Sequence, residues 1–259
     1  MAQVTIKQLL DSGAHFGHQT QRWNPKMKPN IFGDRNGIHI INLEITAKVL
    51  DKALKFLRQV AKGGSTVLFV GTKKQAQDPL MKAAQKSGMP FVNERWLGGM
   101  LTNFETVRKS IKKIEDIDKM EATGEFQYVT KKEGSSLRKE REKLVKNLSG
   151  VREMKKLPGA VFVVDIEKEK IAVFEARKLG IPVVAIADTN SDPELVDIAI
   201  PGNDDAIKAI TLFCDSIADS ILEGANEFRM TQSAEAKPEA DAGIDAAAEE
   251  AFNSATPNQ

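Results

Sequence analysis

The sequence predicts a doubly wound α/β fold, in which a parallel sheet has helices on both faces. Short apolar runs rich in β-branched residues recur along the chain, as buried parallel strands require. Amphipathic helical patterns separate most of these runs. One long, highly charged segment interrupts the alternation. Together these observations indicate a three-layer α/β/α sandwich with an inserted antiparallel α-helical hairpin.

The predicted strands are short apolar runs flanked by turn residues. They are 66–71 (TVLFVG), 90–93, 160–165 (AVFVVD), 182–187 (PVVAIA) and 198–200. Helices are predicted where apolar residues recur every three or four positions, at 43–61, 74–86, 169–179 and 204–222. Gly63, Gly88 and Gly180 end three of these helices and release the chain into the next strand.

Segment 105–156 stands where a crossover helix is expected. It contains fifteen Lys or Arg and ten Asp or Glu residues, in two helical stretches around a turn near 123–134. A narrow row of apolar residues on each stretch predicts a protruding coiled-coil hairpin. Such a charge pattern is also typical of a solvated hairpin without a partner. We favour a role in gripping another macromolecule, because a protruding hairpin buries little of its own surface.

Charge is distributed unevenly along the 259 residues. The net charge is +1, but segment 231–259 has six acidic residues and one basic residue, so the rest carries +6. Few large apolar residues occur in that segment, which is therefore predicted to be a disordered acidic tail. The sandwich domain is expected to comprise residues 1–104, which include an N-terminal arm, and residues 157–230, with the hairpin between them.

Other features limit the class of protein. No apolar run is long enough to span a membrane, and the first residues lack the apolar core of a signal peptide, so a cytoplasmic protein is expected. The single cysteine, Cys214, lies on an apolar helical ladder and is expected to be a buried packing residue. A charge of +6 permits a local nucleic-acid-binding patch without requiring one.

The most unusual segment is 13–42, which joins cations, aromatics and rigid loop residues without a helical or strand period. Bases stack on aromatic rings, phosphates attract lysine and arginine, and a stiff loop loses little entropy on docking. We therefore predict an RNA-binding arm. The predicted contacts in it are His15, His18, Arg22, Trp23, Lys26, Lys28 and Arg35. An arm wrapped over the core of its own domain explains the composition equally well.

Lys73 and Lys74 follow the first apolar strand without the glycines of a dinucleotide fingerprint or a phosphate loop. A phosphate there would satisfy both the lysines and the N-terminus of the next helix, so both lysines are predicted RNA contacts. A plain solvated pair is the alternative.

Segment 93–104 (NERWLGGMLTNF) is the third candidate RNA contact. Arg95 is predicted to contact an anion, and Gly98 and Gly99 permit close approach of RNA to the backbone. The alternative is a hydrophobic hinge in which Trp96 and its apolar neighbours anchor the hairpin. Both roles can hold together.

Acidic residues follow the last two predicted strands. Asp188, Asp204 and Asp205 are expected at one edge of the sheet, where they are weak candidates for holding a hard cation, together with His18. The commoner role is structural, with Asp204 capping the last helix and Asp188 opening a turn. No cysteine completes a zinc set around His15 and His18. No metal site is therefore assigned, and a structural magnesium or zinc ion stays a candidate only.

Several long motifs occur in a distinctive order: GAHFGHQTQRWNPKMKPNIFGDRNGIHIIN, VLFVGTKK, RWLGGMLTNF, and IPVVAIADTNSDP followed by IPGNDDAI. Over residues 4–228 the chain resembles the bacterial small-subunit ribosomal protein S-2 family. The resemblance implies a flavodoxin-like sandwich with a projecting helical hairpin. It also implies a non-enzymatic structural protein that binds small-subunit ribosomal RNA between the head and body of the particle. Such a protein helps to anchor ribosomal protein S-1, which captures messenger RNA.

The alternative function is that of a flavin- or nucleotide-binding enzyme or sensor that uses the carboxyl edge of the sheet. The ribosomal interpretation instead implies ribosomal RNA, ribosomal protein S-1 and neighbouring small-subunit proteins as partners. It implies no cofactor, no small-molecule substrate and no membrane association.

Overall fold

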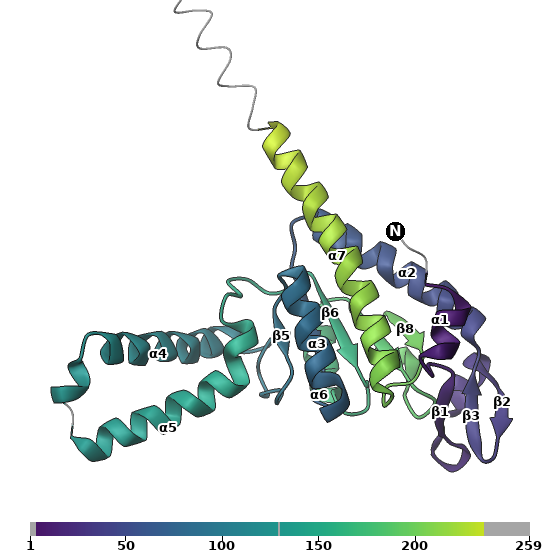
Figure 1. Ribbon diagram of the computed structural model, residues 1–259, viewed down its shortest axis with the longest axis horizontal. Coiled ribbons are helices and arrows are strands. Elements are labelled where there is room, and N and C mark those ends of the chain that lie inside the picture. The colour runs from purple at the N-terminus through teal and green to yellow at the C-terminus, as the bar shows by residue number, and fades with distance from the viewer. Residues whose placement is uncertain (1–3, 129, 236–259) are drawn as a thin grey trace, which may run out of the picture.

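Figure 1 shows the computed structural model, which describes residues 4–128 and 130–235. Within these residues, a five-stranded parallel sheet with the order β5-β4-β6-β7-β8 forms the centre of the main domain. Its strands are β4 (Val67–Val70), β5 (Phe91–Val92), β6 (Ala160–Val164), β7 (Val183–Ala187) and β8 (Ile198–Pro201).

The strand order identifies the fold. Counted along the chain from β4, the strands lie in the order 2-1-3-4-5, which is the flavodoxin-like arrangement. Every residue of β4, β6 and β7 is buried, because both faces of the sheet are covered. The predicted doubly wound parallel sheet is therefore confirmed. Its topological switch point lies between the carboxyl ends of β4 and β6.

Helices cover the two faces of the sheet unequally (Figure 1). One face packs against α2 (Leu43–Lys62), α3 (Lys74–Ser87) and α7 (Ile207–Glu235). The other packs against α6 (Lys170–Lys178), the segment before the hairpin, and the hairpin base. The rings of Phe69 and Phe162 meet edge to face at 5.5 Å between centroids on the first face. The described helices include none that is both long and apolar enough to cross a bilayer.

The last helix differs from its prediction at both ends. The side chain of Asn203, and not that of Asp204, accepts hydrogen bonds from the backbone amides of Asp205 and Ala206, each at 2.8 Å. The helix also continues beyond residue 222 to Glu235, five residues into the predicted acidic tail. Phe228 explains part of this extension, because its ring packs against Gly64 at the end of α2. Residues 236–259 lie outside the described part of the chain.

The charged insertion forms two helices, α4 (Phe104–Ala122) and α5 (Lys131–Leu148), which lie side by side and project from the sheet domain (Figure 1). Asp118 of α4 forms ion pairs with Arg141 of α5 at 2.5 Å and with Arg152, beyond the end of α5, at 2.9 Å. A further pair links Lys113 and Glu140 at 2.5 Å. Few residues are buried between the helices, chiefly isoleucines of α4.

A second, antiparallel sheet follows the short helix α1 (Ile6–Asp11). Its strands have the order β1-β3-β2, with bounds β1 (Phe16–Gln19), β2 (Ile31–Arg35) and β3 (Ile38–Ile41). This corrects the expectation of an irregular loop over residues 13–42. The strand period is hidden because both strand pairs contain register shifts. Asn36 and Gly37, with φ of 54° and 75°, form the two-residue turn between β2 and β3, and this Asn-Gly pair is a recognisable hairpin signal.

Short 3-10 helices complete the described elements: η1 (Thr20–Arg22), η2 (Pro25–Asn30), η3 (Glu125–Tyr128), η4 (Ser149–Val151) and η5 (Pro193–Leu195).

Candidate nucleic-acid interface

The N-terminal arm (residues 13–42) packs on the domain with one side and exposes the other. Met27 is fully buried, and the backbone amide of Asn24 donates to the carbonyl of Thr189 at 2.7 Å. These contacts support the predicted alternative of an arm wrapped over its own core. They also hold the arm rigidly, and a rigid surface loses little entropy when a ligand docks.

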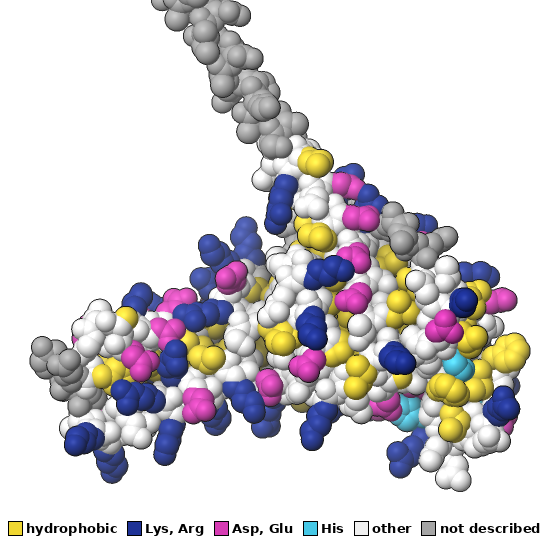
Figure 2. Space-filling view, viewed as in Figure 1, with side chains coloured by type: hydrophobic (Ala, Val, Ile, Leu, Met, Phe, Trp, Pro, Cys, Tyr) yellow, Lys and Arg dark blue, Asp and Glu magenta, His cyan; other side chains and the backbone are white. Residues whose placement is uncertain are grey.

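The exposed surface of the arm combines cations with an aromatic ring. Arg22, Lys28 and Arg35 are exposed on η1, η2 and β2. Phe32 is 78% exposed on β2. Figure 2 shows hydrophobic, histidine and basic side chains together on this part of the molecule, at the lower right. Guanidinium, ammonium and aromatic groups are those that bind phosphates and stack on unpaired bases.

Phe32 was not among the predicted contacts, whereas two of the predicted aromatic contacts are partly buried. The ring of Trp23 packs against that of His39, with 5.4 Å between centroids. The ring of His15 packs against that of Phe16, with 4.0 Å between centroids. Burial lowers the pKa of His15. Identifying Phe32 as the exposed residue required the strand register, which the sequence did not reveal.

Lys26 is exposed but occupied. Its ammonium group lies 2.9 Å from Asp192 and 2.5 Å from Glu194, both near η5. Hydrogen bonds to Glu194 and Asp192 raise the pKa of Lys26. Lys26 therefore fastens the arm to the loop before β8, which makes it a weaker candidate for phosphate than Lys28.

Lys73 has a different role from the predicted one. Its Nζ atom lies 2.6 Å from Asp204, 2.7 Å from Asp205 and 2.9 Å from Asp165. Burial alone would lower the pKa of Lys73, but these carboxylates raise it above its ordinary value. The side chain is only 13% exposed, so Lys73 is a buried counterion rather than a phosphate ligand. Lys74, by contrast, is exposed at the start of α3.

The switch-point crevice is also filled by side chains of the protein itself. Glu169 accepts hydrogen bonds from the amide of Thr72 at 2.8 Å and from its hydroxyl at 2.6 Å. Burial raises the pKa of Glu169. Asp165, with a φ of 71°, brings its carboxylate toward Lys73 from the end of β6. This is the place where flavodoxin-like folds bind flavins and nucleotides, and here buried ionic contacts occupy it.

Three of the predicted metal candidates converge beside this cluster. Ligand atoms of His18, Asp188 and Asp204 all lie within 4.8 Å of one another. His18 Nδ1 lies 3.1 Å from Asp188 Oδ2, and His18 Nε2 lies 3.5 Å from Asp205, the fourth candidate. The hydrogen bond to Asp188 raises the pKa of His18.

Asp204 is the most constrained member of this group. It is 0% exposed, and its Oδ2 atom has no hydrogen-bond partner among the described residues. Burial, reinforced by the charges of Asp188 and Asp165, raises the pKa of Asp204 to about 7. The neighbourhood therefore favours a bound cation or a retained proton, and it disfavours a phosphate.

The segment 96–102 (WLGGMLT) is a hinge between the sheet and the hairpin. Its donors surround the buried carboxylate of Glu175 on α6. They are Trp96 Nε1 at 3.1 Å, the amides of Gly99 at 2.7 Å, Leu101 at 3.0 Å and Thr102 at 3.1 Å, and the Thr102 hydroxyl at 3.1 Å. Glu175 thus occupies the predicted backbone cradle for RNA, and the hydrophobic-hinge alternative is the one observed. Arg95, next to the hinge, is exposed.

A family model described as Ribosomal protein S2 matches residues 9–224. The chain belongs to the ribosomal protein S2 family. This family consists of ribosomal proteins, so the predicted non-enzymatic role in the small ribosomal subunit, within the cytoplasmic translation machinery, is confirmed.

Similar members of the ribosomal protein S2 family cover most of the chain. The small ribosomal subunit protein uS2 of Bdellovibrio bacteriovorus is 59% identical over 228 residues, which are 88% of this chain and 73% of the relative. That of Nocardia farcinica is 57% identical over 243 residues, 94% of this chain and 85% of the relative. That of Treponema pallidum is 56% identical over 227 residues, 88% of this chain and 78% of the relative.

Proposed function

We propose that this chain binds small-subunit ribosomal RNA at the junction between the head and body of the particle, mainly through its N-terminal arm. Family membership supports ribosomal RNA as the ligand class. The observation that carries the assignment to the arm is its exposed group of four side chains: Arg22 on η1, Lys28 on η2, and Phe32 and Arg35 on β2. Lys74 and Arg95, both exposed, are secondary contacts. His18 holds the arm to the sheet domain through Asp188, whereas His15 and Trp23 pack against other rings of the arm.

The arm can be tested by changing three cations together. A triple variant with Arg22, Lys28 and Arg35 replaced by alanine should bind ribosomal RNA more weakly and with a smaller salt dependence. Each lost phosphate contact should reduce the slope of log affinity against log salt by roughly 0.7 to 0.9. Filter binding of the purified protein to small-subunit ribosomal RNA at several salt concentrations measures this slope.

The control variant also removes three positive charges, but from α2 instead of the arm. Lys48 and Lys52 are exposed there, and Lys55 pairs with Asp51. Replacing these three lysines with alanine should leave the salt slope nearly unchanged. Equal slopes for the arm variant and the α2 variant would contradict the assignment of RNA binding to the arm.

The proposal includes help in anchoring ribosomal protein S-1 and contact with neighbouring small-subunit proteins. Support for these partners comes from membership of the family alone. Small subunits reconstituted with this chain should retain more ribosomal protein S-1 than subunits reconstituted without it. Equal retention would remove this part of the proposal.

The proposal also includes a divalent cation bound by His18, Asp188 and Asp204. The orphaned, buried Asp204 Oδ2 atom supports it, because a cation would supply the missing partner. The His18 imidazole favours zinc, because magnesium prefers oxygen ligands. The two carboxylates can bind either ion. The cation would offset the excess of carboxylates over the single ammonium of Lys73.

Metal-stripped protein should gain thermal stability when zinc is added. Binding to the folded state alone stabilises a protein by about 2.7 kcal/mol at a ligand concentration of 100 Kd. The Asp204→Asn variant should lose this gain, while Asp78→Asn, at an exposed acid on α3, should keep it. Melting curves with zinc and with magnesium measure the effect, and an unchanged melting temperature with both ions would exclude the cation.

A further inference from the structure

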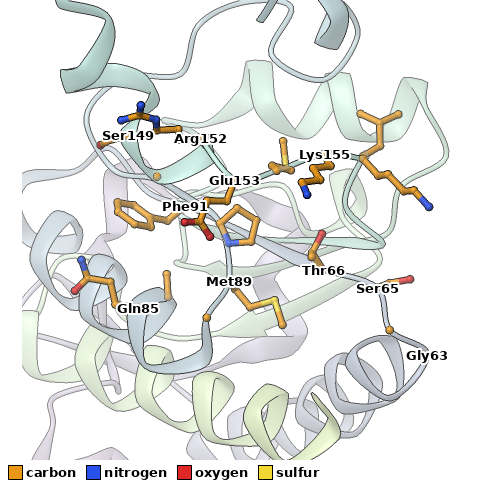
Figure 3. Close-up of a pocket in the computed structure, with 18 residues that line it drawn as sticks. Gly63, Ser65, Thr66, Gln85, Met89, Phe91, Ser149, Arg152, Glu153 and Lys155 are labelled. Atoms are coloured by element: carbon orange, nitrogen blue, oxygen red, sulfur yellow. The ribbon is translucent and has the colours of Figure 1, made fainter. Parts of the chain in front are cut away.

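A large cavity lies at the amino edge of the sheet, on the opposite edge from the arm and the buried charge cluster. Its volume is about 830 Å³. The loops that lead into β4, β5 and β6 line it, together with the ends of α2 and α3 and the base of the hairpin. Figure 3 shows the lining side chains around the opening. Neither the arm nor the buried charge cluster around Lys73 contributes a residue to its lining.

One wall of the cavity carries two lysines that form no ion pair with the described residues. Lys155 and Lys156 are exposed in the segment between η4 and β6, and neither forms an ion pair with a described residue. Nearby cations are already paired: Arg152 with Asp118, and Lys86 with Asp219. Lys155 and Lys156 therefore remain available for an anionic ligand.

The rest of the lining suits a flat, polar-edged group. Met89, Pro90 and Phe91 form an apolar floor, and Ser65 and Thr66 add exposed hydroxyl-bearing residues. Glu153 is the one carboxylate among the lining residues, and Figure 3 shows it close to Phe91. A carboxylate there can accept a hydrogen bond from the exocyclic amino group of adenine, cytosine or guanine.

We infer that this cavity binds one unpaired nucleotide of RNA. The phosphate would meet Lys155 and Lys156, and the base would lie against the floor with its amino group toward Glu153. RNA is recognised largely through such unstacked nucleotides, which proteins hold by stacking and by contacts to base edges. The inference rests on the proposed function, since it adds a second contact to the same RNA.

Two variants test the site in different ways. Gln85, exposed on α3, lines the cavity, so Gln85→Trp should block it without changing the charge. The double variant Lys155→Ala/Lys156→Ala removes the phosphate ligands. Each should weaken binding to small-subunit ribosomal RNA by about tenfold at fixed salt, the scale of losing one stacked base or its phosphate contacts. Lys48→Ala/Lys52→Ala on α2 is the charge-matched control, and unchanged melting temperatures show that the variants fold.

Free mononucleotides distinguish RNA from a small nucleotide as the source of the ligand. Titration with adenosine and uridine monophosphates, followed by the amide signals of Gly88, Met89 and Phe91, should give at most weak shifts that favour adenosine monophosphate. Saturable binding of a mononucleotide, with full RNA affinity in Gln85→Trp, would overturn the assignment to RNA.

Wild-type RNA affinity in both cavity variants would overturn the inference. If the arm variant were still impaired in the same assay, the proposed function would stand without this site. Full affinity in the arm variant and in both cavity variants would contradict both.

Discussion

Replacing Glu175 with alanine is expected to destabilise the protein by about 3 to 5 kcal/mol, because buried hinge donors lose their acceptor. Five hydrogen bonds from Trp96, Gly99, Leu101 and Thr102 end on this carboxylate. Trp96 and Leu101 are buried, so their donors have little access to water as a replacement acceptor. Urea unfolding of the two proteins measures the loss.

The control for this change is Glu142→Ala on α5, where the side chain is exposed. It should change the free energy of unfolding by less than about 0.5 kcal/mol. A loss below about 1 kcal/mol for Glu175→Ala would show that the hinge does not depend on this carboxylate.

Glu175 also predicts a pH effect with a definite sign. Burial alone would raise its pKa, but the hydrogen bonds from Thr102, Trp96, Gly99 and Leu101 lower the pKa below the ordinary value of 4.5. A lowered folded-state pKa adds stability above pH 4.5 that is lost as the pH falls through the folded value. The free energy of unfolding of the Glu175→Gln variant should therefore fall less steeply than that of the natural protein as the pH is lowered below 4.5.

Replacing Lys73 with methionine is the second change with a large expected effect. It would leave Asp165 and Asp204 buried without their common cation. Removing one partner of a buried ion pair costs about 3 to 5 kcal/mol, because the remaining charge is uncompensated. The free energy of unfolding, measured in chelator to keep added metals out, should fall accordingly.

The double variant Lys73→Met/Asp204→Asn provides the internal comparison. It removes one carboxylate together with the lysine, so it should be more stable than Lys73→Met alone. If the two variants were equally stable, or if Lys73→Met matched the natural protein, the cluster would not be held together by Lys73.

The central sheet could be predicted from sequence because its signals are local. Apolar runs such as 160–165 are too short and too uniformly apolar for amphipathic helices. Glycines before these runs mark where each helix ends and the next strand begins. Helices α2, α3 and α6 lie close to their predicted bounds for the same reason, whereas α7 extends well past its predicted end at residue 222. The arm was harder, because its register shifts remove the alternation by which strands are recognised.

The roles of individual charged residues depended on contacts between distant segments. Lys73 at a helix start suggested a phosphate site, but β6 and β8 bring Asp165 and Asp204 to it. Glu175 lies on an amphipathic helix, where a glutamate is usually exposed, and only the position of the hinge shows that it is buried. Nothing in the local sequence distinguishes these residues from solvated ones.

Electron cryomicroscopy of small subunits that contain this chain will show whether the arm is its main RNA-binding surface. We predict density for the chain between the head and body, with Arg22, Lys28 and Arg35 against RNA phosphates and Phe32 against a base or an RNA groove. An ordered chain whose arm faces solvent or another protein, with RNA bound elsewhere, would show that the arm is not the main RNA-binding surface.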